Sequence, residues 1–226
     1  MNLSPDSIVY WQSGFVVINA TLVFTWAIML FLVIFSWTVT RNLSTGEKIS
    51  KKQNLLESIV GGVLSQIQEI EQKNPKKNLP LVGTLFIFIA ISNVLTVVPG
   101  FQAPTGSLST TTALALWVFV AIPVYGIGQV GFLAYMKNYF QPSPLMLPFN
   151  VMGEVSRILA LAVRLFGNIM SGSMIGMILL SLAPIIFPII MQLFGLLTGL
   201  VQAYIFAVLA AVYLAAAAQT QQSNSP

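Results

Sequence analysis

Three charged side chains within a long apolar stretch have the types and spacing that could perform chemistry. Glu154, Arg157 and Arg164 fall between residues 149 and 182, in a run that is otherwise almost entirely apolar or small. At about 100° per residue in an α-helix, these charges and Asn168 share one stripe about 80° wide. A charge at bilayer depth costs about 3 to more than 10 kcal/mol, so it faces a partner or a water-filled cavity. The stripe therefore predicts an ion-pairing or ion-conducting role.

The three charges do not have the same set of partners. Arg157 lies one helical turn from Glu154, so we predict that these two form a structural ion pair near the cytoplasmic end of the helix. Arg164 is ten residues from Glu154, which corresponds to about 15 Å along a helix axis. No acid of this chain's membrane region can neutralise Arg164 at that distance. We expect its counter-charge to come from another protein, either as a fixed structural ion pair or as part of the function.

The composition identifies the class of protein that must position this stripe. Of 226 residues, 56% are hydrophobic and only 7% are charged, whereas soluble domains carry about 25% charged residues. We predict an all-α integral membrane protein, without a cleaved signal peptide because no basic segment precedes the first apolar run. Cysteine and histidine are absent, which excludes disulfides, His-based zinc sites and Ser-His-Asp triads. No Walker motif occurs, and we expect no cofactor and no fixed metal site.

The apolar runs predict about five membrane helices and one amphipathic helix between the first two. Seven of the ten basic residues lie between residues 41 and 78, so we place this loop in the cytoplasm and the N-terminus outside. The net charge of +4 therefore indicates membrane topology, not nucleic-acid binding. The amphipathic helix would lie on the membrane or dock onto a partner, and a solvated connector is the alternative. The expected spans are residues 15–40, 79–98, 112–135, 149–182 and 189–218.

The last two predicted helices are unusually long. Each has about 30 residues or more, which gives at least about 45 Å of helix for a hydrocarbon core of about 30 Å. They must tilt strongly, with a break near Pro184 and Pro188. The third span contains Pro123 and three glycines that we expect to interrupt it. The C-terminal tail then lies in the cytoplasm.

The last helix carries one strongly polar side chain at mid-depth, Gln202, with Tyr204 and Tyr213 nearby. A buried amide there could join neighbouring helices or could serve Arg164. Two G-x-x-x-G patterns, Gly172 to Gly176 and Gly195 to Gly199, are typical of close helix packing.

Two of these segments resemble a known family. Arg164-Leu-Phe-Gly-Asn168 followed by Gln202-Ala-Tyr-Ile-Phe-Ala-Val-Leu-Ala-Ala-Val-Tyr213 is similar to the core of the a subunit of F-type ATP synthases. Asn93-Val-Leu-Thr-Val-Val-Pro99 looks like an earlier motif of the same family. The resemblance implies a stator that is not catalytic by itself. Its two long tilted helices would form a hairpin against a rotating ring of c subunits, with peripheral-stalk b subunits and the rest of the complex as further partners.

The resemblance also implies the roles of individual residues in a bacterial plasma membrane. Arg164 would be the essential arginine between two ion half-channels, and a ring carboxylate passing it would be favoured in its ionised form and release its ion. Gln202 would be its neighbour on the last helix, and Asn168 would line a channel. The further residues that we assign to the ion path are Asn93, Thr96, Ser171, Ser173 and Tyr204.

The departures from the family pattern bear on the coupling ion. Proton-translocating relatives often carry an acid at the positions of Thr96 and Ser173, and some carry a histidine at that of Gly195. The remaining hydroxyls and amides could conduct water-borne protons or pass sodium between oxygen ligands, but they cannot hold a proton near neutral pH. We therefore favour Na⁺ over H⁺. The segments SPDSIVYWQSGFVVINATLVFTWAIM and QNLLESIVGG look like the bacterial N-ATPase type, which is often associated with sodium export.

Two other classes of protein remain as alternatives. A stand-alone channel or secondary transporter would be expected to show internal repeats with paired broken helices, and the two halves of this chain differ in charge and helix length. A purely structural scaffold of a membrane complex would leave Arg164 without an explanation.

Overall fold

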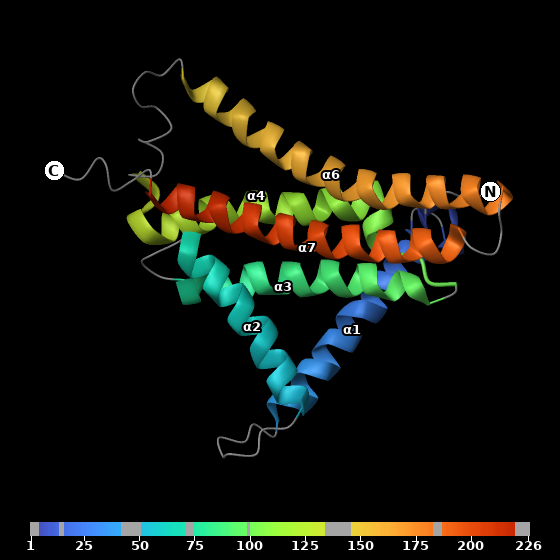
Figure 1. Cartoon of the computed structure of the whole chain (residues 1–226). Helices are drawn as coiled ribbons and strands as arrows, with labels where there is room; N and C mark the ends of the chain where they lie inside the picture. Colours follow the sequence, from blue (N-terminus) through green and yellow to red (C-terminus); the bar gives the residue numbers. More distant parts are fainter. Residues whose placement is uncertain are drawn as a thin grey trace.

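The computed structural model describes residues 5–13, 16–41, 51–70, 75–98, 100–133, 146–182 and 187–219. Within these residues, five helices are long and apolar enough to cross a membrane. They are α1 (Ala20–Thr40), α3 (Pro75–Val94), α4 (Leu108–Val130), α6 (Met146–Leu182) and α7 (Phe187–Gln219) (Figure 1). The prediction of an all-α integral membrane protein with about five spans is confirmed.

A small hairpin precedes the first span, and the sequence did not predict it. After a 3₁₀ turn, η1 (Pro5–Ser7), strand β1 (Val9–Ser13) pairs antiparallel with β2 (Val16–Asn19). The first helix therefore begins at Ala20 and not at residue 15, because the β-branched residues before it pair as a strand. The backbone N–H of Ala20 donates to the carbonyl of Ile8 at 2.9 Å, which joins the helix to the hairpin.

The loop between α3 and α4 contains two more 3₁₀ turns, η2 (Leu95–Val97) and η3 (Pro104–Gly106). Helix α4 begins at Leu108, before the predicted residue 112, and continues through Pro123. It ends at Val130 because Gly131 has φ +87°, a left-handed conformation that glycine adopts without strain. The predicted interruption is thus wrong at Pro123, Gly126 and Gly128 but confirmed at Gly131, so the helix ends five residues before the predicted residue 135.

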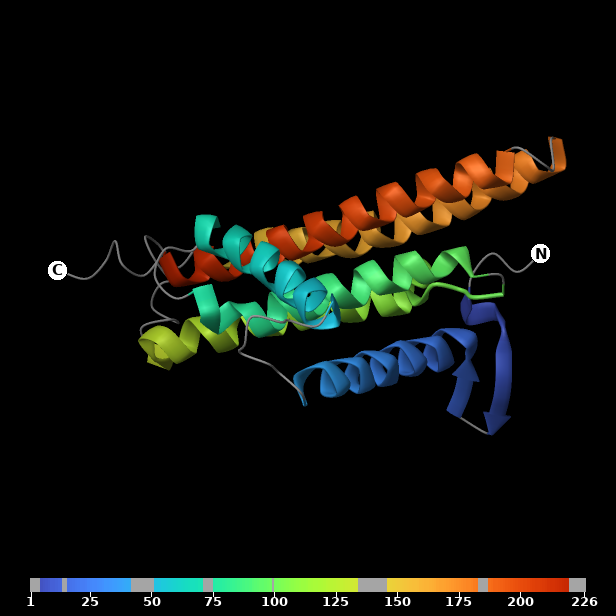
Figure 2. The ribbon, with the colours of Figure 1, turned by 60° about the horizontal axis from the view of Figure 1, so that its bottom comes forward.

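Helices α6 and α7 are the longest elements, with 37 and 33 residues. At 1.5 Å per residue they measure about 55 and 50 Å, well beyond a hydrocarbon core of about 30 Å. Figure 2 shows them side by side as one outer layer, with α3 and α4 between them and α1. In Figure 1 the first half of α6 diverges from α7.

Small side chains form the contact between the central helices. Four alanines of α7 belong with Phe206 and Leu214 to the buried cluster that α7 forms with α3, α4 and α6; they are Ala203, Ala207, Ala210 and Ala211. In lipid the hydrophobic effect does not drive helices together, so small residues that permit close backbone approach provide the packing.

The amphipathic helix predicted in the basic loop is α2 (Lys51–Ile70). Its residue Ile67 is only 1% exposed and belongs to the central hydrophobic cluster, with Val63 and Ile70 packed beside it. Helix α2 contacts both α3 and α7. A solvated connector is therefore wrong for residues 51–70, and this helix docks onto the chain's own membrane helices.

Candidate ion path

Arg164 lies at the middle of α6, 18 residues from Met146 and 18 from Leu182. Its side chain is exposed, and so are the apolar Leu159 and Val163 beside it, at 56% and 59%. The adjacent side of the helix is buried through Leu161 and Leu165. Among the residues that the structure describes, no carboxylate forms an ion pair with Arg164.

Gln202 lies near the middle of α7, 15 residues from its first residue and 17 from its last. Because α6 and α7 are consecutive helices that run in opposite directions (Figure 1), their midpoints share one depth. The Gln202 side chain is only 6% exposed, and within the described part of the chain its Nε2 has no hydrogen-bond partner. A buried donor without an acceptor costs about 1–3 kcal/mol. The Arg164 guanidinium and the unpaired donor Gln202 Nε2 therefore lie at a similar depth.

Asn93 joins three elements close to that depth. Its Nδ2 donates to the carbonyl of Gly199 on α7 at 2.8 Å, and Thr105 Oγ1 of η3 donates to its Oδ1 at 3.0 Å. The side chain is 1% exposed. Asn93 therefore fixes α3 and η3 against α7 one turn from Gln202.

Thr96 lies in the turn after α3. Its hydroxyl donates to the carbonyl of Asn93 at 2.6 Å, and Gln192 of α7 donates to the carbonyl of Thr96 at 3.3 Å. Gln192 was not among the predicted site residues. Its amide, in an otherwise apolar part of the helix, was the signal that could have identified it.

Asn168, Ser171 and Ser173 lie in the C-terminal half of α6. The Ser171 hydroxyl donates to the carbonyl of Asn168 at 3.2 Å, and the Ser173 hydroxyl donates to that of Ile169 at 2.9 Å. Both serines are exposed. Since their protons are directed to the helix backbone, their oxygen lone pairs are available to a cation or to water.

The N-terminal half of α6 carries the other two charges. The Arg157 guanidinium lies 5.6 Å from the centre of the Tyr213 ring on α7, a cation–π contact. Glu154 lies half-buried one turn away on the same helix. Its ion pair with Arg157 stays a prediction.

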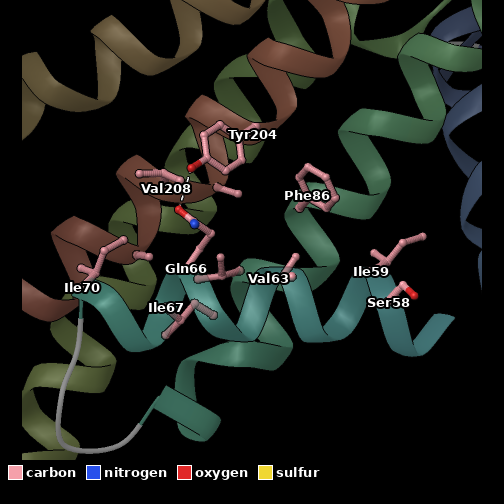
Figure 3. A pocket seen from close by; sticks show the side chains of 13 residues that line it. Ser58, Ile59, Val63, Gln66, Ile67, Ile70, Phe86, Tyr204 and Val208 are labelled. Atoms are coloured by element: carbon pink, nitrogen blue, oxygen red, sulfur yellow. Dashed lines mark hydrogen bonds between the residues drawn. The ribbon is translucent and has the colours of Figure 1, made fainter. Parts of the chain in front are cut away.

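Tyr204 joins α7 to the amphipathic helix. Its hydroxyl donates to Gln66 Oε1 of α2 at 2.6 Å (Figure 3). The pair borders an apolar cavity of about 310 Å³ between α2, α3 and α7. The sequence did not indicate Gln66, because the pattern of an amphipathic helix does not show what it docks against.

The glycines of the two G-x-x-x-G patterns have different surroundings. A Cβ added at Gly199 would lie 2.9 Å from Asn93 Cβ, so this glycine permits the contact of α7 with α3. Within the described residues, a Cβ at Gly172, Gly176 or Gly195 would meet nothing within 4 Å. Among the described residues, the predicted close helix packing is therefore found at Gly199 and not at the other three glycines.

Comparison with known proteins identifies the family of a chain with this geometry. The sequence model described as ATP synthase A chain matches residues 22–215. The chain belongs to the ATP synthase A chain family. As a member, it is an ion-translocating, non-catalytic subunit of the membrane sector of ATP synthase.

Individual relatives match over nearly their whole length. The chain is 60% identical to ATP synthase subunit a 2 of Acaryochloris marina, over 99% of this chain and 96% of the relative. It is 55% identical to ATP synthase subunit a 1 of Chlorobaculum parvum, over the full length of both. It is 58% identical to ATP synthase subunit a of Albidiferax ferrireducens, over 96% of this chain and 94% of the relative. This chain is therefore a multi-pass bacterial membrane protein.

Proposed function

We propose that this chain is the stator a subunit that couples cation flow to the rotation of a ring of c subunits in an F-type ATP synthase. The observation that carries the proposal is Arg164, an exposed cation at the middle of a helix about 55 Å long. Exposed apolar residues such as Val163 flank it, and no acid among the described residues pairs with it, so the charge requires a partner outside this chain. A carboxylate on each c subunit supplies that partner.

The mechanism follows from one fixed charge between two half-channels. A ring carboxylate that reaches Arg164 is favoured in its ionised form and gives up its cation. The guanidinium also repels a cation that would cross directly from one half-channel to the other. Gln202 Nε2, a buried donor near the same depth, provides a hydrogen bond to the carboxylate when it arrives.

The contact between α6 and the ring can be tested by crosslinking, because the chain contains no cysteine. Val163→Cys, beside Arg164, should form a disulfide with a cysteine introduced next to the ring carboxylate and should stop rotation. Trp26→Cys serves as the control, since Trp26 is equally exposed on α1 but lies across the molecule from α6. Equal crosslinking of both variants to the ring would contradict the proposed contact.

We further propose Na⁺ as the coupling ion. The spans contain no histidine and no acid other than Glu154, whereas hydroxyl and amide oxygens at Thr96, Ser171 and Ser173 are suited to an alkali cation. ATP synthesis by the reconstituted complex should rise and saturate with luminal sodium at constant pH. Synthesis that is independent of sodium and collapses fully with a protonophore would show H⁺ coupling instead.

The proposed orientation has the N-terminus outside and the C-terminus in the cytoplasm of a bacterial plasma membrane. The basic residues of the segment 41–78 support it. Binding to peripheral-stalk b subunits is also part of the proposal. Co-purification with these subunits and with a ring of small hairpin subunits tests it.

A further inference from the structure

One charge of the chain lies outside the stripe on α6. Asp6 is the only charged side chain in the first 40 residues, and residues 78–136 and 165–226 contain none. In the proposed orientation, the outer side of this protein therefore carries a single charged side chain, which is negative. A lone fixed charge in uncharged surroundings concentrates ions of the opposite sign.

Hydroxyl groups hold the Asp6 carboxylate at the outer ends of two membrane helices. Thr21 Oγ1, in the first turn of α1, donates to Oδ1 at 2.6 Å, and Ser107 Oγ, directly before α4, donates to Oδ2 at 2.6 Å. A further hydroxyl, that of Ser109, lies 2.6 Å from Ser107 Oγ. Thr21 and Ser107 are buried, but Asp6 itself keeps part of its surface exposed. The carboxylate is thus fixed in position, in a residue that is only partly buried.

The segment beside Asp6 leads directly to the candidate ion path. Residues Pro104–Gly106 of η3 are all buried. Thr105 donates to Asn93, which in turn donates to Gly199 of α7. A Cβ at Gly106 would lie 3.1 Å from Ile169 Cγ2, and Ile169 directly follows Asn168. The same loop therefore contacts Asp6 through Ser107 and α6 beside Asn168, and it is joined through Asn93 to α7 one turn from Gln202.

The outer end also holds acceptor oxygens without donors. Within the described residues, Asn19 Oδ1 and Gln102 Oε1 are buried and have no hydrogen-bond partner. Asn19 lies two residues before Thr21, and Gln102 follows Phe101, whose ring centroid lies 4.8 Å from that of Phe24 on α1. Buried acceptors of this kind require a water molecule or a cation. Carboxylate, hydroxyl and amide oxygens are also the ligands that hard cations prefer.

We propose that Asp6 is the outer collecting residue of the ion path, a carboxylate that attracts and transiently binds the coupling cation before it passes η3 towards α6 and α7. The proposal rests on the proposed function, since it assumes that cations enter from this side. Its ligand is a small monovalent cation, Na⁺ or H⁺. A purely structural clamp between η1, α1 and α4 is the competing role.

The two roles are separated by removing the charge and the hydrogen bond in different variants. Asp6→Asn removes the charge but keeps an acceptor oxygen, and Thr21→Val removes one hydrogen bond but keeps the charge. ATP synthesis is measured in proteoliposomes of the whole complex at a fixed membrane potential, first against luminal sodium and then against luminal pH. The two titrations distinguish the two cations.

A collecting carboxylate affects the ion concentration that gives half-maximal rate. Asp6→Asn should raise this KM about three- to tenfold at low ionic strength and change the maximal rate less than about twofold. The difference from wild type should shrink when choline chloride screens the charge. Thr21→Val should leave KM within about twofold of wild type. An unchanged KM in Asp6→Asn, or an equal rise in both variants, would overturn the proposal.

A second variant, which moves the carboxylate to the other end of a hydrogen bond, tests the proposal if the complex with Asp6→Asn does not assemble. The double variant Asp6→Ser with Ser107→Asp exchanges the two ends of one hydrogen bond and keeps one carboxylate at the same place. It should restore the wild-type KM, and a KM that stays raised in this assembled variant would overturn the proposal. Failure of the proposed function would appear separately, as coupled synthesis that persists in Arg164→Ala.

Discussion

At the scale of single residues, polar side chains differ in whether their partners lie inside the chain. Asn93 has two partners here, on α7 and η3, whereas Arg164 has no acidic partner among the described residues. Asn93 was predicted as an ion-path residue, and its position beside the route towards Gln202 is compatible with that role. The sequence could not reveal its partner Gly199, because the two are 106 residues apart.

Replacing Asn93 should destabilise the subunit, because its removal leaves the buried Thr105 hydroxyl without its partner and breaks the hydrogen bond from α3 to the Gly199 carbonyl of α7. Asn93→Ala should cost about 1–3 kcal/mol, measured as a lower temperature at which the subunit dissociates from the purified complex. Thr105→Val removes only one of the two hydrogen bonds and should cost less. An Asn93→Ala variant as stable as wild type would contradict this structural role.

At the scale of elements, the long apolar runs predicted the spans because apolar length and charge position are read directly from a sequence. The N-terminal hairpin was missed because Val16–Asn19 continues without a break into the apolar helix Ala20–Thr40. The sequence did not decide what α2 docks onto, because an amphipathic pattern shows which face of a helix is apolar but not what covers that face. The contact of α7 with α3 depends on Gly199, which the G-x-x-x-G pattern did indicate.

Adding one methyl group to that glycine should separate the two helices. Gly199→Ala would place Cβ 2.9 Å from Asn93 Cβ, which forces α7 away from α3 and weakens the Asn93 hydrogen bond. A cost of about 1–3 kcal/mol is expected from such overpacking, with a lower dissociation temperature of the complex. Gly61→Ala is the control, since its Cβ would meet nothing within 4 Å on α2. Equal effects of the two substitutions would show that the contact is not critical.

At the scale of the whole molecule, the charge distribution predicts the orientation in the membrane. Seven of the ten basic residues lie between residues 41 and 78, and Asp6 is the only charge before them. The family could be predicted from the sequence motifs, and the fold could be predicted from the apolar runs. The role of the outer end could not, because Asp6, Thr21 and Ser107 come together only through the fold.

Cysteine labelling tests the orientation, because the chain has no native cysteine. Tyr10→Cys in the exposed hairpin should react in intact cells with a maleimide that does not cross membranes. Gly61→Cys on α2 should react only after the membrane is opened. The reverse pattern would place the N-terminus in the cytoplasm and would contradict the proposed direction of ion entrance.

The central claim is that Arg164 forms its ion pair with a carboxylate on another subunit, and that this subunit moves past it. The most direct test measures ion-driven ATP synthesis by the reconstituted complex carrying Arg164→Ala, with Arg157→Ala as the control from the same helix. Arg164→Ala should assemble with the ring but lose coupled synthesis entirely. Arg157→Ala, which loses a contact with Tyr213 inside the chain, should retain synthesis at a reduced rate. Coupled synthesis that persists in assembled Arg164→Ala would contradict the account.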